Sequence, residues 1–304
     1  MNFKIPFMKY RKIAAIASLI LFAVSILSIA FRGLSLGLDF SGGTLVELTF
    51  KETIPLESLR VDLSANNYED FQVVNFGSDT DVLIKIADVE GNSSIGDEVF
   101  DLVQSNYPET ELKRIEFVGP QIGSELRDQG GFGMLVALGM ILLYVAFRFQ
   151  YKFAVGAVVA LAHDVVIILG LFSIFTWDFD LTVFAALLAV IGYSLNDTIV
   201  VSDRIRENFR SQRGINPDEV VDLSINQMLS RTLITSLTTL LVLFALFILG
   251  GELIKGFSLA LIIGVLIGTY SSIYVVANML LMFGINQEDM AIPDPDEGPL
   301  DDMP

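Results

Sequence analysis

Six long apolar runs in a chain of 304 residues direct this protein to a membrane fold. The chain is 53% hydrophobic, which is more than one soluble globule of this size needs for its core. A helix of roughly 20 apolar residues crosses the hydrocarbon core of a bilayer. The expected membrane segments are residues 13–31, 130–149, 153–175, 181–202, 232–249 and 257–283.

The first run has two interpretations. It follows a basic cluster, and Ser28-Ile29-Ala30 resembles a small-residue cleavage site, so a cleavable signal is one alternative. The run is longer than the apolar part of a typical signal and nearly long enough to span. We therefore expect a retained first transmembrane helix.

A water-soluble α+β domain is expected at residues 38–126, between the first and second membrane helices. Its periodicity predicts a strand, a helix, two strands, a helix and a strand, at residues 43–50, 55–66, 71–76, 82–87, 94–105 and 112–118. The order βαββαβ is typical of a ferredoxin-like sandwich. The domain has no His or Cys, so we expect a binding or lever domain, with a structural spacer as the alternative.

The remaining chain divides into three further parts. Residues 1–37 form the N-terminal segment with the first helix, and residues 127–286 hold helices two to six with a cytoplasmic loop at 203–230. In that loop, Asn216 and Pro217 resemble a helix N-cap and N1, and we expect a separate helix along the membrane surface. The Pro- and Asp-rich tail, 287–304, is expected to be disordered.

Basic residues predict the orientation. They gather before the first run, at the turn with Arg148 and Lys152, and at 204–213, and all three places fall on one side if the runs alternate. Cytoplasmic connections are enriched in Lys and Arg. Both termini are therefore expected in the cytoplasm and the folded domain outside it.

Polar residues inside the runs are the candidate functional residues. Asn196 and Asp197 lie in the fourth run, Asp164 in the third, and Arg231 at the start of the fifth. Ionisable residues in a membrane are costly and usually functional. The topology puts Asp197 and Arg231 at one level, so we expect them to meet and to couple proton uptake to motion; the alternative is a static ion pair, with Asp164 a satisfied packing residue.

Small and polar side chains on four helices predict a wet seam around these residues. His163, next to Asp164, is expected to be a packing or interfacial residue rather than a relay. Gly264 and Gly268 form a small-xxx-small pair that permits close helix approach. The other expected members are Ser194, Thr198, Ser202, Thr235, Thr238, Thr239, Ser271 and Asn278.

Five segments carry a family resemblance: 38–44 (Leu-Asp-Phe-Ser-Gly-Gly-Thr), His163-Asp164, 192–198 (Gly-Tyr-Ser-Leu-Asn-Asp-Thr), its continuation 200–208, and 231–239. They resemble the SecF family of the SecD–SecF protein-export complex, within the resistance-nodulation-division superfamily. The similarity runs from the first helix through the sixth and leaves out the acidic tail. In the first segment, Asp39, Gly42 and Gly43 also suit a tight structural entry to the domain.

The resemblance implies a partner and a driving force. Members pair with SecD in the bacterial inner membrane and use the proton gradient to help draw an unfolded polypeptide from the SecYEG channel, with YajC and YidC as further partners. The resemblance also implies that Asp197 and Arg231 take part in proton passage, and that the outer domain moves during export.

Other functional classes fit the sequence less well. The net charge of −17 argues against a nucleic-acid partner. No nucleophile–base set, metal-ligand spacing or phosphate loop is present, so we expect neither an enzyme nor a cofactor, and with no cysteine there is no disulfide. Two alternatives to a proton-driven export subunit remain: a passive scaffold of the translocon, and half of a small-molecule proton antiporter.

Overall fold

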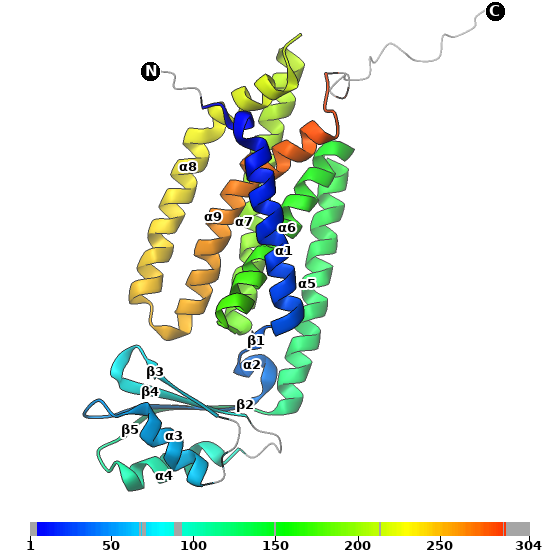
Figure 1. Cartoon of the computed structure of the whole chain (residues 1–304). Helices are drawn as coiled ribbons and strands as arrows, with labels where there is room; N and C mark the ends of the chain where they lie inside the picture. The colour runs from blue at the N-terminus through cyan, green and yellow to red at the C-terminus, as the bar shows by residue number, and fades with distance from the viewer. Residues whose placement is uncertain are drawn as a thin grey trace, which may run out of the picture.

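The computed structural model describes residues 5–66, 68, 71–87, 93–148, 150–212, 214–287 and 289. Within these residues, six helices long and apolar enough to cross a membrane form one bundle, as predicted, and a small α/β domain lies at one end of it (Figure 1). After a 3-10 turn, η1 (Phe7–Tyr10), the membrane helices are α1 (Arg11–Arg32), α5 (Pro120–Arg148), α6 (Tyr151–Phe175), α7 (Leu181–Ser211), α8 (Pro217–Leu249) and α9 (Glu252–Met282).

The bundle has a centre and a periphery. Half of the most apolar stretch of α6, of α7 and of α9 is buried, against 17% for α1 and for α8 and 6% for α5. The central helices therefore pack on neighbours within the chain, whereas α5 and α8 present most of their apolar surface outward.

The small domain has the predicted order of elements. Its strands are β2 (Gly43–Thr49), β3 (Phe71–Phe76), β4 (Ser78–Ile86) and β5 (Glu111–Val118), and its helices are α3 (Leu56–Ala65) and α4 (Ile95–Asn106). The strands form one antiparallel sheet in the order β3-β4-β2-β5, which is the arrangement of a ferredoxin-like βαββαβ sandwich. The helices pack on the sheet through Leu59, Leu63, Val99 and Val103, which are buried against Val46, Leu48, Val82 and Ile84.

A short helix and two glycines join the bundle to the domain. After α2 (Leu38–Ser41), Gly42 and Gly43 have φ of 72° and 132°, a region that favours glycine. A Cβ on Gly42 would lie 2.8 Å from Pro120 Cα, so the start of α5 packs on this turn. In α2, Asp39 Oδ2 accepts a 2.9 Å hydrogen bond from the backbone N–H of Leu181, which opens α7.

A second connection is a two-stranded parallel pairing that the sequence did not predict. β1 (Ser35–Leu36) follows α1 and pairs with β6 (Asp178–Phe179) in the turn between α6 and α7. Asp178 also accepts a hydrogen bond and ion pair from Lys85 of β4. The domain is therefore tied to the bundle at this turn as well as through the chain.

Three expected helix boundaries are wrong. α7 continues to Ser211, nine residues into the loop expected at 203–230. Residues 217–230 are not a separate helix: Asn216 is the N-cap and accepts from the backbone N–H of Asp218, with Pro217 as the first helical residue as expected, and α8 then continues without a break to Leu249. No Gly or Pro follows Pro217 within α8, so nothing interrupts its backbone hydrogen bonds. α5 begins ten residues before the apolar run at Gly130, because its polar first turns suit a helix as well as a loop.

Candidate functional site

The middle of α7 presents a polar buried side. Ser194, Asp197, Thr198 and Ser202 are buried, with spacings of three and four residues that put them on one face of the helix. Asn196 is exposed, so it lies outside the predicted seam and points away from the other helices of this chain.

Asp164 is the centre of a buried polar cluster. Its side chain is 0% exposed. Oδ2 accepts hydrogen bonds from Ser194 Oγ at 2.5 Å and from Ser271 Oγ at 2.8 Å, and Oδ1 lies 2.9 Å from His163 Nδ1. Asp164 thus connects α6 to α7 and α9, and it is a hydrogen-bonded group rather than an isolated charge.

Two glycines bring α9 close enough for this cluster to form. A Cβ on Gly264 would lie 2.1 Å from Val190 Cγ2, and a Cβ on Gly268 would lie 3.0 Å from Ser194 Cβ. Side chains at either position would separate α9 from α7. The small residues therefore bring Ser271 of α9 and Ser194 of α7 within hydrogen-bond distance of the same carboxylate oxygen.

His163 links the cluster to α1. Its ring lies parallel to that of Phe22 at 1° and packs near the ring of Tyr270, whose hydroxyl donates to the carbonyl of Ala14. Nε2 of His163 is buried and has no hydrogen-bond partner among the described residues. The packing role expected for His163 is present, and a direct contact with Asp164 accompanies it.

Asp197 lies one helical turn beyond Ser194 and is 6% exposed. Its Oδ2 is buried and has no hydrogen-bond partner among the described residues. The predicted contact with Arg231 is not made in the part of the chain that the structure describes: Arg231 is exposed and forms no ion pair with Asp197.

The rotation of α8 about its own axis explains why Arg231 forms no ion pair with Asp197. Thr232 and Ser236, four residues apart, face into the bundle, and Ser236 Oγ lies within hydrogen-bond distance of Tyr193 and Thr269. Arg231 precedes Thr232 and lies about 100° around the helix. Sequence reasoning missed this inward pair, although its spacing of four was visible.

The other polar residues expected in the seam lie elsewhere. On α8, Thr235 and Thr238 are exposed and donate to carbonyls of their own helix, which satisfies their hydroxyls without a neighbour. Thr239, half-buried, does the same. On α9, Asn278 Nδ2 donates to the carbonyl of Arg11 at the start of α1. The seam is therefore narrower than predicted and centres on Asp164.

Two protein-family models match the chain. The one described as protein export membrane protein SecD/SecF, C-terminal, matches residues 98–286, and the SecD/SecF GG motif matches residues 27–54. A protein translocase subunit SecF from Vibrio alginolyticus is 47% identical over 306 residues, covering 99% of this chain and 97% of that protein. A subunit of the same name from Pseudomonas aeruginosa is also 47% identical and is covered over its full length.

Solved structures give the same result. The crystal structure of SecDF, a translocon-associated membrane protein from Thermus thermophilus, superimposes with a TM-score of 0.82 at 39% identity and covers 92% of this chain. SecDF in a super-membrane-facing form gives a TM-score of 0.70 at 38% identity. The present chain spans 39% of each of those SecDF chains.

Proposed function

The chain belongs to the SecD/SecF family of protein-export membrane proteins, which are transport proteins and not enzymes, and we propose that it serves as the SecF subunit of Sec protein translocation, together with SecD. In this proposal it lies in a bacterial inner membrane with both termini in the cytoplasm, and the proton gradient drives its work on a polypeptide leaving the SecYEG channel.

Oδ2 of Asp197, which is buried and has no hydrogen-bond partner among the residues that the structure describes, carries the proton proposal. A carboxylate that is buried without a partner is costly to keep charged, so a proton or a cationic partner at this atom relieves the cost. Asp197 lies one turn from Ser194, which already holds Asp164. Protonation at Asp197 therefore acts beside the hydrogen bonds that connect the three central helices.

Arg231 supports a second state of the site. Arg231 and Asn196 are both exposed in the single chain, and a SecD-like bundle packed there would bury them. In the proposed cycle, Arg231 approaches Asp197 when the carboxylate is charged and withdraws when it is protonated. A proton crossing the membrane field supplies about 2.3 kcal/mol per 100 mV, which is enough to bias two such states.

In this proposal the outer domain moves together with α7. Asp178 and Lys85 join it to the turn between α6 and α7, and Asp39 joins the entry helix α2 to the first residue of α7. A shift of α7 relative to α6 would therefore be passed to the domain at two points. We propose that this movement holds or releases the exported polypeptide.

Export from reconstituted vesicles tests the proposal. Asp197→Asn, combined with a SecD-like subunit, is expected to abolish the stimulation of late export by a proton gradient while assembly with that subunit persists. The matched control is Asp128→Asn on α5, whose carboxylate is exposed beside Arg127. Undiminished stimulation in the Asp197 variant would rule out the proton role and leave a passive scaffold.

A further inference from the structure

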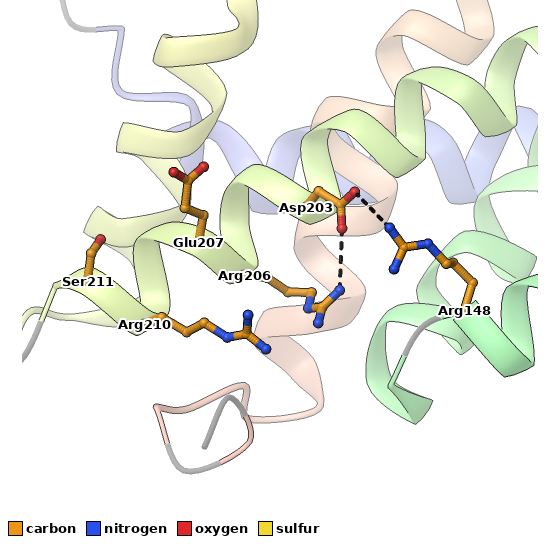
Figure 2. Close-up of a pocket in the computed structure, with 6 residues that line it drawn as sticks. All are labelled: Arg148, Asp203, Arg206, Glu207, Arg210 and Ser211. Atoms are coloured by element: carbon orange, nitrogen blue, oxygen red, sulfur yellow. Dashed lines mark hydrogen bonds and ion pairs between the residues drawn. The ribbon is translucent and has the colours of Figure 1, made fainter. Parts of the chain in front are cut away.

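A basic pocket of about 630 Å³ lies between the ends of α5 and α7, away from the Asp164 cluster. Figure 2 shows Arg206 and Arg210 on one side of α7 and Arg148 at the end of α5, around a common space. The pocket is lined by Arg148, Asp203, Arg206, Glu207, Arg210 and Ser211.

The two acidic residues of the pocket neutralise only part of the charge of its three arginines. Asp203 is shared by Arg206, at 3.4 Å, and by Arg148, at 3.9 Å, and both distances are longer than the 2.7–2.9 Å of a strong charge-assisted bond. Glu207 is held by Arg204 at 2.8 Å, and Figure 2 shows it pointing away from Arg206 and Arg210.

The guanidinium groups of Arg206 and Arg210 have N–H donors that no side chain among the described residues occupies. Arg206 Nε is buried and has no hydrogen-bond partner among the described residues. Arg210 is exposed, and its side chain forms no ion pair in the part of the chain that the structure describes. Guanidinium groups bind phosphate oxygens in pairs, so two of them four residues apart on one helix suit a phosphate group.

The surface below the pocket suits acyl chains. On α5, the residues that precede Arg148 include Met140, Tyr144 and Phe147, and these are exposed, Phe147 at 85%. Only 6% of the most apolar stretch of α5 is buried within the chain. The pocket thus lies where an apolar helix face ends in Arg148, which is the depth of lipid headgroups.

We propose that this pocket binds the phosphate of an anionic phospholipid, with Arg206 and Arg210 as its main ligands and the acyl chains along the outer face of α5. Basic pockets between membrane helices are known to hold such headgroups. A free phosphate ion offers the same oxygens, but it has no apolar part that could cover the exposed apolar surface beside the pocket.

Titration of the purified full chain in neutral detergent micelles tests this site. The probes are short-chain phosphatidylglycerol, short-chain phosphatidylcholine and inorganic phosphate. Phosphatidylglycerol is expected to bind at least about tenfold more tightly than either other probe, and about tenfold more weakly to the double variant Arg206→Gln/Arg210→Gln. The matched control Arg127→Gln removes a charge near the other end of α5 and should leave binding unchanged.

The single variant Arg210→Gln separates loss of a ligand from misfolding, because this side chain is exposed and forms no ion pair among the described residues. It should weaken phosphatidylglycerol binding with an unchanged unfolding temperature. Equal binding of phosphatidylcholine would overturn the proposal in favour of general lipid contact, and equal binding of inorganic phosphate would overturn it in favour of a soluble ion. Full retention of phosphatidylglycerol by the double variant would also overturn it.

Discussion

Ser194 Oγ donates a hydrogen bond of 2.5 Å to Asp164 Oδ2, so the middle of α7 is tied to the middle of α6. Ser271 of α9 donates to the same oxygen. Asp197 lies one turn further along the same buried side of α7. A change of charge at Asp197 therefore occurs one turn from a hydrogen bond that joins α7 to α6, which connects the proposed proton site to the packing of the bundle.

Replacement of Asp164 should weaken the bundle as well as its function. Asp164→Asn puts an N–H donor in place of the oxygen that faces His163 Nδ1, and it turns the charge-assisted hydrogen bonds from Ser194 and Ser271 into neutral ones. A hydrogen bond to a charged group contributes roughly 1.5–3 kcal/mol and a neutral one about 0.5–1.5 kcal/mol. We expect a lower unfolding temperature in detergent and reduced gradient-dependent export. Asp128→Asn, on the exposed side of α5, is the control, and an unchanged unfolding temperature for Asp164→Asn would contradict the structural role.

Close packing of α7 and α9 predicts the effect of a single methyl group. Gly264→Ala places a Cβ 2.1 Å from Val190 Cγ2, and overpacking of this kind costs about 1–3 kcal/mol. Thermal unfolding should show the loss, and the added change Val190→Ala should restore part of it. Gly192→Ala on α7 is the control, because its Cβ would meet nothing within 4 Å. Equal stability of the two glycine variants would argue against close contact at Gly264.

Labelling of Asn196 tests whether a second bundle covers the outer side of α7. The chain has no cysteine, so Asn196→Cys introduces a unique thiol at an exposed position. A nitroxide spin label on this thiol should be mobile in the single chain and immobilised in the complex with a SecD-like subunit. The same label at Val61→Cys, on the exposed side of α3, should be equally mobile in both. Equal mobility at Asn196→Cys would place the partner elsewhere.

The helices and the βαββαβ order could be predicted because long apolar runs and strand alternation are local patterns. The rotation of each helix is not local. Arg231 and Thr232 are neighbours in the sequence, and only packing on α7 and α9 decides that Thr232 turns inward. The β1–β6 pairing was also missed, since two-residue strands have no periodicity to detect. Asp164 was predicted, but its contact with His163 was not.

Acid should loosen the pairing of β2 with β4 in the outer domain through Asp81. A hydrogen bond from Thr49, and then one from Ser78, lower the pKa of Asp81 below its usual value, against the opposing effect of burial. A carboxyl with a lowered pKa stabilises the fold above its unfolded pKa of about 4, and this contribution is lost as pH falls through the folded value. The protection factors of the backbone amides in β2 and β4 against hydrogen exchange should therefore fall below about pH 4. Asp81→Asn should flatten this dependence, whereas the exposed Asp79→Asn should leave it intact; a steep dependence that persists in Asp81→Asn would assign it to another carboxyl.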